Sequence, residues 1–375
     1  MSLFDVYPLF DITPVKGEDV YVYDDKGNKY LDLYGGHAVI SIGHSHPSYV
    51  KNISNQVSKL GFYSNSIQNP LQNNLANKLT ELSGCTDYKL FLCNSGAEAN
   101  ENAIKLASFH TNKKKLIAFT NSFHGRTSAA VAATDNTKIV APVNAQQEVE
   151  FFDLGDITGV EKSLKKGDVC AVIVEFVQGV GGLGESDAQF YEKLDQLCKE
   201  HGACLIADEV QSGFGRTGDF FAFQKYNIEP EIISIAKGMG NGFPVGGILI
   251  HPAIKASYGL LGTTFGGNHL ACIASLTVLE TIEKESLMEN VFEIYSYFLQ
   301  QSSSIQKHAK VKGRGLMLGL EFDFPVKELR SNLIYKHHIF TGSSKNPNLL
   351  RILPPLTLKK EHIDDLFDAI KSELS

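Results

Sequence analysis

Two charged residues follow apolar runs that are typical of buried strands. In the stretch EIISIAKGMG the apolar run leads to Lys237, and in ACLIADEVQSG a similar run leads to Asp208. The carboxyl ends of strands in an open α/β sheet form the crevice in which ligands bind. We therefore expect this amine and this carboxylate to face a shared cavity rather than bulk solvent.

The chemistry that suits this pair is that of pyridoxal phosphate (PLP). A lysine in a desolvated crevice can lose its proton and form a Schiff base with an aldehyde. An aspartate can keep the pyridine nitrogen of the cofactor protonated, which makes the ring an electron sink, and Gln211 can reach the phenolic oxygen. A salt-bridged loop lysine and a helix-capping aspartate are the ordinary structural roles of such residues. However, DEVQSG shows no helical continuation, and the glycines of GMGNG let a ligand approach the backbone.

A phosphate site is indicated by CNSGAEAN, in which Ser95 and Gly96 lie between an apparent strand and an apparent helix. The free N–H groups at the start of a helix bind anions. Most Ser-Gly turns of this kind are simple caps, so the motif is informative only in combination with Lys237 and Asp208.

Two arginines are candidates for binding substrate carboxylates, because the guanidinium fork contacts both carboxylate oxygens. Arg126 lies in SFHGRT and Arg351 in LLRILPP. Phe123 could stack on a planar ring, although burial in the core is the commoner fate of phenylalanine. Glu175, in a buried-looking strand, is a further candidate for the substrate site, unless it is an ion-paired structural carboxylate.

The elements that must position these residues predict an α/β fold. DVYVYDDKGNKYLDL alternates apolar and polar residues around the turn DDKGN, which indicates a hairpin. From about residue 47, short apolar runs alternate with helical patterns, which predicts a mostly parallel sheet covered on both faces. A chain of 375 residues is long enough for one large and one smaller domain.

The composition narrows the function class. The formal charge of −7 is spread along the chain, which argues against nucleic-acid binding. We expect no membrane span, because the longest apolar run, VCAVIVEFV, is short and contains a glutamate. The six cysteines show no CxxC spacing, so neither a metal site nor a disulfide framework is indicated, and a cytoplasmic location fits best.

At this point the motifs resemble a known family. NSGAEANE, FHGRT, EFVQGVGG, DEVQSGFGRTG, AKGMGNGFPVGG and TTFGGNHLA occur in the order found in class III (subgroup II) aminotransferases, which are fold-type I PLP enzymes. The resemblance runs from GHSHP at 43–47 to RILPPL at 351–356. It implies a large PLP-binding domain at 46–270 and a small α+β domain built from 1–45 and 271–375.

The resemblance also implies roles at matching positions. Lys237 would hold PLP covalently, Asp208 would bind the pyridinium nitrogen and Gln211 the phenolic oxygen. The phosphate would lie on Ser95, Gly96 and Ala97, and the ring between Phe123 and Val210. Thr264 would reach the phosphate of a neighbouring subunit, which implies a homodimer. Of the substrate residues, Arg126 would bind the distal carboxylate and Arg351 the α-carboxylate of glutamate, with Glu175 beside them.

Four positions depart from the family pattern. Val180 replaces an acid that is thought to pair with the arginine matching Arg351, and Phe176 replaces a proline. His269 also stands where proline is usual, and His37 where an aliphatic residue or tyrosine is common. These changes leave the cofactor site intact and concern the substrate.

Within the family, FHGRT, DEVQSGFGRTG and RILPPL are most similar to the group that acts on acetylornithine, succinylornithine and ornithine. The function this implies is transfer of the δ-amine of N2-acetylornithine to 2-oxoglutarate. Succinylornithine, ornithine, lysine and 4-aminobutyrate are rival amine donors. The residues also leave open a PLP aminomutase or decarboxylase, or a binding protein without activity. A dehydrogenase is disfavoured, because no GxGxxG follows the first strand of a βαβ unit.

Overall fold

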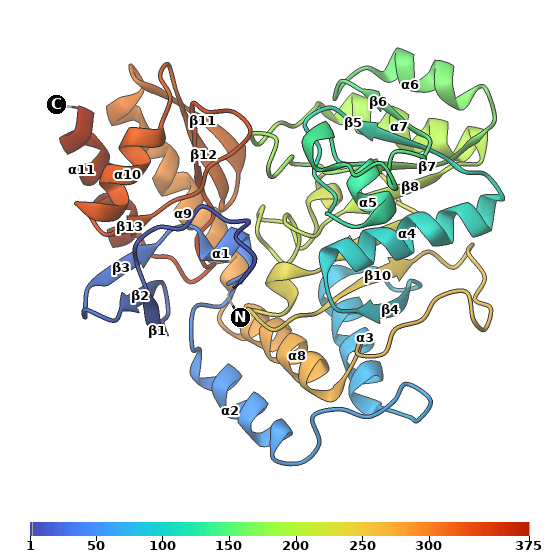
Figure 1. Ribbon diagram of the computed structural model, residues 1–375, viewed down its shortest axis with the longest axis horizontal. Coiled ribbons are helices and arrows are strands. Elements are labelled where there is room, and N and C mark those ends of the chain that lie inside the picture. The colour runs from blue at the N-terminus through green and yellow to red at the C-terminus, as the bar shows by residue number, and fades with distance from the viewer. Residues whose placement is uncertain (2, 375) are drawn as a thin grey trace.

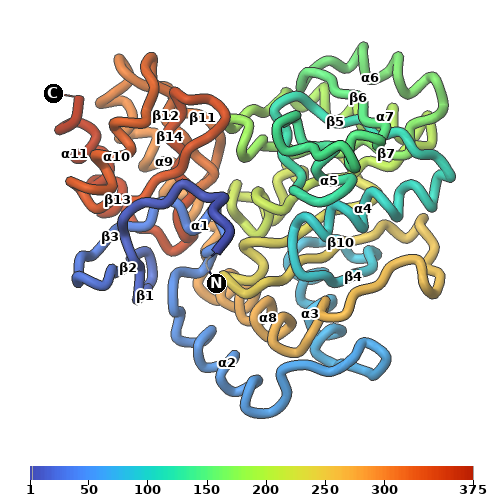
Figure 2. The backbone as a smooth tube through the Cα atoms, viewed as in Figure 1, coloured from blue at the N-terminus to red at the C-terminus, as the bar shows by residue number. Residues whose placement is uncertain are grey.

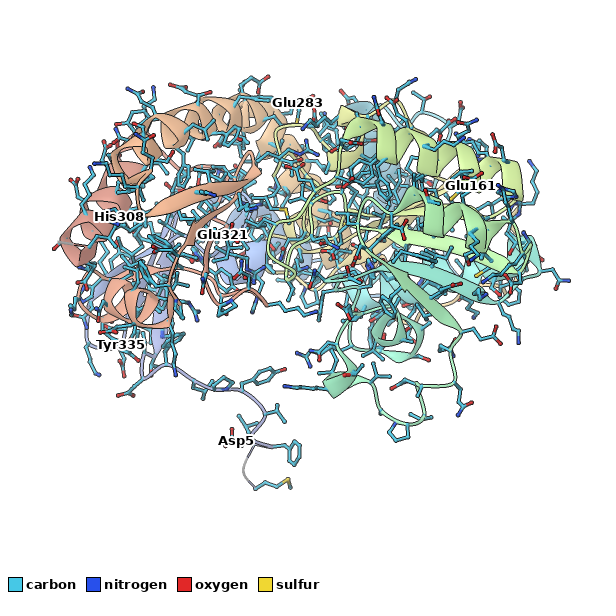
Figure 3. The ribbon with its side chains drawn as sticks, turned by 90° about the horizontal axis from the view of Figure 1, so that it is seen from above. Asp5, Glu161, Glu283, His308, Glu321 and Tyr335 are labelled. Atoms are coloured by element: carbon cyan, nitrogen blue, oxygen red, sulfur yellow. The ribbon has the colours of Figure 1, made fainter. Side chains whose placement is uncertain are left out.

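The structure is a computed structural model that describes residue 1 and residues 3–374. Figure 1 shows two lobes, a larger one around a long sheet and a smaller one that contains both ends of the chain. Seen from above in Figure 3, Glu161 lies in the large lobe, whereas Glu321 and Tyr335 lie in the small one. Within this described part of the chain, no helix has the length and hydropathy of a membrane span.

The large lobe is organised by a seven-stranded sheet with the strand order β4-β10-β9-β8-β7-β5-β6. All neighbours from β9 to β6 are parallel, and β10 is antiparallel to both β9 and β4. The mostly parallel sheet expected from the sequence is therefore confirmed. The strands are β4 (Lys89–Cys93), β5 (Lys115–Phe119), β6 (Val149–Phe152), β7 (Val169–Val174), β8 (Cys204–Asp208), β9 (Ile232–Ile235) and β10 (Gly246–Ile250).

Helices cover both faces of this sheet, which explains why its central strands read as continuous apolar runs. In β8, Ile206 packs in the core cluster that contains Ala103 of α4. Leu205 packs in the other cluster, with Leu194 of α7. The helices of the lobe are α3 (Pro70–Ser83), α4 (Gly96–Thr111), α5 (Ser128–Ala132), α6 (Ile157–Leu164) and α7 (Ala188–His201). The short 3₁₀ helices are η1 (Thr137–Ile139), η2 (Ala222–Lys225) and η3 (Lys237–Met239).

The small lobe combines segments from opposite ends of the chain, as the blue and red ends of the tube in Figure 2 show. The expected hairpin is confirmed, since β2 and β3 pair antiparallel, and Asp24 Oδ1 accepts bonds from Lys26 N and Asn28 N in the turn. One sheet has the order β1-β2-β3-β13 and the other β11-β12-β14. The strands are β1 (Pro14–Glu18), β2 (Tyr21–Asp24), β3 (Lys29–Asp32), β11 (Ala309–Arg314), β12 (Met317–Phe322), β13 (Ile339–Phe340) and β14 (Leu349–Ile352).

Helices connect and cover these small sheets. Helix α8 lies between the lobes, where it packs against α2 and α3. The remaining helices are α1 (Gly35–Ala38), α2 (Pro47–Val57), α8 (His269–Lys284), α9 (Leu287–Ser302), α10 (Lys327–Tyr335) and α11 (Lys360–Leu374), with the 3₁₀ helix η4 (Ser303–Ile305). The domain boundaries at residues 45 and 270 stay a prediction.

Candidate active site

A cavity of about 380 Å³ lies at the carboxyl ends of the central strands. We call it the Lys237 cavity. It brings together ten of the residues singled out from the sequence. They are Ser95, Gly96, Ala97, Phe123, Arg126, Glu175, Asp208, Val210, Gln211 and Lys237.

Lys237 lies one residue beyond the end of β9, after Ala236, and opens the short helix η3. Its φ of 48° lies in the left-handed region, which is uncommon for a residue with a side chain and is found at functional sites. Burial lowers the pKa of its amine, and the positive charge of Arg351 adds to this effect, whereas Asp208 and Glu175 oppose it. A lysine whose proton is destabilised in this way can act as a nucleophile or base.

Asp208 ends β8 as a buried carboxylate held by three donors. Its Oδ2 accepts bonds from Asn100 Nδ2 at 2.8 Å and from His124 Nδ1 at 2.7 Å. Its Oδ1 accepts one from the N–H of Val210 at 3.1 Å. Each carboxylate oxygen has two acceptor positions, so Oδ1 retains capacity for a further donor in the cavity.

The turn between β4 and α4 forms an anion cradle. Ser95 is the N-cap of α4, and its Oγ accepts a bond from the N–H of Glu98 at 3.2 Å. The N–H groups of Gly96 and Ala97 belong to the first turn, which has no intrahelical acceptors for them. A Cβ at position 96 would lie 2.5 Å from Val210 Cγ1, so only glycine leaves this approach open.

Gln211 and Glu175 meet at the glycine-rich segment after β7. Gln211 donates from Nε2 to the carbonyl of His37 at 3.1 Å, while its Oε1 is buried without a partner among the described residues. Glu175 accepts bonds from the N–H of Phe123 at 2.9 Å and of Gly179 at 2.8 Å. Burial raises the pKa of Glu175 above its ordinary value, although His124 and the two N–H groups act in the opposite direction.

Arg351 lies on β14 and contacts the same segment from the small lobe. It is 3% exposed and donates to the carbonyls of Ser343 (2.6 Å) and Gly179 (2.9 Å) and to the Tyr34 hydroxyl (3.2 Å). In residue 1 and residues 3–374 no carboxylate forms an ion pair with it. Val180, at the position where the family pattern has an acid, is apolar and lines the Lys237 cavity.

Tyr34 connects Arg351 to His37. The Tyr34 hydroxyl lies 2.5 Å from His37 Nδ1. Burial and the positive charges of Arg351, Lys237 and Arg330 lower the pKa of His37. This favours a neutral imidazole, whose Nδ1 can accept a hydrogen bond from the Tyr34 hydroxyl. The Tyr34 oxygen is then free to accept from Arg351, so one chain of hydrogen bonds runs from Arg351 to His37.

Comparison with known proteins identifies the family. The model of the family "Aminotransferase class-III" matches residues 5–374. The chain belongs to the class-III aminotransferases. Consistent with this membership, it is 40% identical to the acetylornithine aminotransferase of Aquifex aeolicus over 99% of both chains. It is 38% identical to that of Bacillus subtilis, over 100% of this chain and 98% of the relative.

Solved structures of class-III aminotransferases and their relatives have the same fold. The acetylornithine aminotransferase of Elizabethkingia anophelis is 30% identical, with a TM-score of 0.84, over 98% of this chain and 94% of that chain. An ornithine aminotransferase of Toxoplasma gondii with PLP at its active site is 25% identical, with a TM-score of 0.88, over 97% and 90%. The chain is thus a PLP-dependent aminotransferase of fold-type I.

The residues of this class-III aminotransferase fit PLP. The cofactor needs an amine for its aldehyde, an acceptor for its ring nitrogen, a donor set for its phosphate and space for a flat ring. Lys237, Asp208 and the start of α4 meet the first three needs around one cavity. The buried, unpartnered Oε1 of Gln211 and the narrow approach at Gly96 are further signs of a site shaped for a polar ligand.

Two predicted residues are exposed. Arg126 lines the Lys237 cavity but is exposed at its open side. Thr264 is exposed in the loop before α8 and does not line the Lys237 cavity of its own chain. Asn94 on the phosphate side donates to Thr263 Oγ1 at 3.3 Å, which places this loop next to the anion cradle.

Sequence reasoning missed two residues that organise the site. Asn100 bridges Asp208 and the carbonyl of His124, and its signal was its place in SGAEAN, one turn into the helix that begins at the cradle. Tyr34 is hydrogen-bonded to both Arg351 and His37. The sequence singled out His37 only as a departure from the family pattern. Arg351 lies 317 positions away from Tyr34, so no local pattern shows their contact.

Proposed function

We propose that this aminotransferase exchanges the δ-amine of N2-acetylornithine with the oxo group of 2-oxoglutarate, giving N-acetylglutamate 5-semialdehyde and glutamate, in arginine biosynthesis. The observation that carries the proposal is that Lys237 and the exposed Arg126 line one cavity, while a second guanidinium, that of Arg351, is bonded to Gly179 next to the cavity residue Val180. Both substrates of this reaction carry carboxylates at a distance from the reacting carbon. The full-length similarity to proteins named acetylornithine aminotransferase supports the same choice.

Each residue then has a proposed task. When bound, PLP supplies the electron sink that stabilises a carbanion at the amine-bearing carbon. Lys237 takes the proton from that carbon and returns it to the other reacting position, because burial lowers the pKa of its amine. Asp208, fixed by Asn100 and His124, accepts a hydrogen bond from the ring nitrogen.

The other residues bind and orient. Ser95, Gly96 and Ala97 hold the phosphate, Phe123 and Val210 enclose the ring, and Gln211 contacts its phenolic oxygen. Arg126 binds the distal carboxylate and Arg351 the α-carboxylate of glutamate. Glu175 has both oxygens bound to backbone N–H groups. It therefore supports the substrate site by holding the segments of Phe123 and Gly179 together.

We further propose that the enzyme is a cytoplasmic homodimer in which Thr264 completes the phosphate site of the partner subunit. The exposure of Thr264 and its absence from the lining of its own cavity support this arrangement. The large unit would span 46–270 and the small one 1–45 with 271–375.

The decisive experiment follows the absorbance of the bound cofactor in single half-reactions. Glutamate should change the spectrum, and N-acetylglutamate 5-semialdehyde should restore it. A comparison of kcat/KM for acetylornithine, succinylornithine, ornithine, lysine and 4-aminobutyrate then ranks the amines. A spectrum that glutamate leaves unchanged, or a higher kcat/KM for ornithine or 4-aminobutyrate than for any acyl-ornithine, contradicts the proposal.

Replacement of the lysine tests the assignment of the catalytic base. Lys237→Ala should remove the absorbance of covalently bound PLP and reduce kcat by at least about 1,000-fold, since both the covalent attachment and the proton transfer are lost. The exposed Lys59→Ala is the matched control and should behave like the wild type. Turnover of the Lys237 variant at a rate near that of the wild type would show that another group moves the proton.

A further inference from the structure

Arg330, on α10, is a half-buried cation without a counter-ion. Its Nε donates to the carbonyl of Thr341 at 2.9 Å, and its guanidinium lies 5.1 Å from the centre of the Phe10 ring. No carboxylate among the described residues is paired with it. Arginines that are fully buried are almost always paired. Because Arg330 is half-buried and has no such partner, its terminal nitrogens are available to an anion.

The Arg330 side chain lines a second cavity of about 1150 Å³, which we call the Arg330 cavity. Val39 lines both this cavity and the Lys237 cavity, so the two meet there. Tyr34 and His37 also line the Arg330 cavity, directly beside Arg351. The two cavities are therefore neighbours at Val39, and Arg330 lies on the far side of this residue from Lys237.

The polar wall of the Arg330 cavity has unused capacity. Thr341 is 1% exposed, and its Oγ1 is buried without a hydrogen-bond partner in the part of the chain that the structure describes. Such orphaned hydroxyls are uncommon and call for an explanation such as a ligand. Thr341 and Arg330 line the same cavity. The Arg330 Nε is bonded to the Thr341 carbonyl, so the terminal nitrogens of Arg330 are its remaining donors.

The charge of this cavity is positive. Asp32 is a carboxylate in its wall, but its oxygens are already bound by the N–H groups of Tyr34 and Gly35 and by His44 Nε2 at 2.8 Å. Burial and the positive charge of Arg351 both lower the pKa of Arg330. An anion bound between the two arginines would remove this repulsion.

The remaining wall is mixed. Its apolar part contains Leu9, Phe10, Val326, Phe340 and Leu349, and its polar part includes Lys327, a further positive charge, with serine and asparagine side chains. A ligand that fits has a short methylene chain to pack on the apolar side chains and a carboxylate at its end. An N-acetyl group has a methyl group but no methylene chain, and it has no terminal carboxylate.

We propose that the Arg330 cavity binds the acyl arm of an N2-acyl-ornithine, and that Arg330 pairs with a carboxylate at the end of this arm. The enzyme then prefers carboxyl-terminated acyl groups, such as succinyl, to acetyl. This inference rests on the proposed transfer of the δ-amine of an N2-acyl-ornithine, and it changes the preferred acyl group from acetyl to one with a terminal carboxylate. A planar guanidinium can bind both oxygens of such a carboxylate, which is the strongest form of this contact.

The test measures binding of two unreactive analogues, N2-succinylnorvaline and N2-acetylnorvaline, to the PLP-loaded enzyme by calorimetry. Norvaline lacks the δ-amine, so no amine is transferred. The wild type should bind the succinyl compound about tenfold more tightly or better, because a charge-assisted pair is formed. Arg330→Met should abolish this preference, and Arg330→Lys, which keeps the charge without the fork, should retain part of it.

Lys310→Met is the matched control, since it removes an exposed positive charge from the small lobe outside the Arg330 cavity. It should keep the wild-type preference. Equal affinities for both analogues in the wild type, or an unchanged preference in a folded Arg330→Met protein, overturn the inference. Folding of each variant is checked by its thermal transition and PLP absorbance.

A kinetic measurement separates failure of this inference from failure of the proposed function. The ratio of kcat/KM for succinylornithine to that for acetylornithine should fall about tenfold in Arg330→Met. If neither acyl-ornithine transfers its amine in the wild type, the proposed function is wrong even where the analogues bind as expected. If both transfer it and the ratio is the same in wild type and variant, only the inference about Arg330 is wrong.

Discussion

At the scale of single residues, polar side chains without a full set of partners line the two cavities. Gln211 Oε1 and Thr341 Oγ1 are buried without partners among the described residues, and Arg351 gives its protons to neutral oxygens. Loss of the acid at position 180 leaves Arg351 without a carboxylate to release before substrate binds. Its direction is instead set by the carbonyls of Ser343 and Gly179 and by the Tyr34 hydroxyl.

This chain of bonds predicts a pH dependence. Since burial and nearby cations lower the pKa of His37, the imidazole stays neutral from alkaline pH down through its ordinary range near ~6.5. Protonation at still lower pH stops His37 Nδ1 from accepting the hydrogen bond of the Tyr34 hydroxyl. The contact between Tyr34 and Arg351 is then weakened, while the bonds from Arg351 to Ser343 and Gly179 remain. The KM for glutamate should therefore be constant near neutral pH and rise only in the acid range.

Substitutions show whether the rise of KM at low pH comes from His37 or from an unspecific effect of acid on the enzyme. Tyr34→Phe should raise the KM for glutamate about tenfold with a smaller change in kcat, because one charge-assisted bond is lost. His37→Phe should make that KM higher and independent of pH over the acid range. The exposed His110→Phe is the control. A His37→Phe enzyme that keeps the wild-type pH profile of KM contradicts the role of His37.

The catalytic half of the site was predictable from sequence for a physical reason. Asp208 ends β8 and Lys237 lies just beyond β9. Both strands are mainly apolar, and strand ends in a parallel sheet share one edge. The partners of Arg351 were not predictable, since Tyr34 and Gly179 approach it from distant parts of the chain. The same holds for Arg330, whose sequence neighbours form an ordinary amphipathic helix.

At the scale of elements, the start of α4 has two roles: it caps the helix and it can bind an anion. Ser95 caps the helix through Oγ, and its hydroxyl proton remains free to donate to an anion. The strands and helices around it were predictable because their apolar runs are long and regular. β13 was not, because it is two residues long and pairs in parallel with β3 from the opposite end of the chain.

The capping role and the anion-binding role of Ser95 can be separated by comparing it with Asp187, which caps another helix. Ser95→Ala and Asp187→Ala each remove a side-chain acceptor from a helix start, since Asp187 accepts from Phe190 N at 2.8 Å at the start of α7. Each should lower the free energy of unfolding of the PLP-free protein by about 1 kcal/mol. Only Ser95→Ala should also weaken PLP binding, by about tenfold. Equal PLP affinity of the two variants would show that Ser95 is only a cap.

At the scale of the whole molecule, an apolar surface lies beside the anion cradle. Phe62 and Phe265 pack with ring centres 5.3 Å apart, yet they are 41% and 59% exposed. Tyr63 and Ile67 are exposed in the same segment, and Asn65 Nδ2 donates to the carbonyls of Thr263 and Gly266. Exposed apolar clusters of this kind mark protein interfaces, and this one surrounds Thr264.

A second copy of the chain is the occupant that the proposed role of Thr264 requires. Phe265→Glu places a charge in the apolar cluster, so it should shift the enzyme from dimer to monomer and weaken PLP binding, because each site loses the partner's loop. Sedimentation velocity and a PLP titration measure the two effects. Phe109→Glu is the matched control, since Phe109 is 53% exposed at the end of α4 and should stay dimeric. If the Phe265 variant becomes monomeric but binds PLP as tightly as the wild type, the interface is real and Thr264 contributes nothing to the phosphate site of the partner.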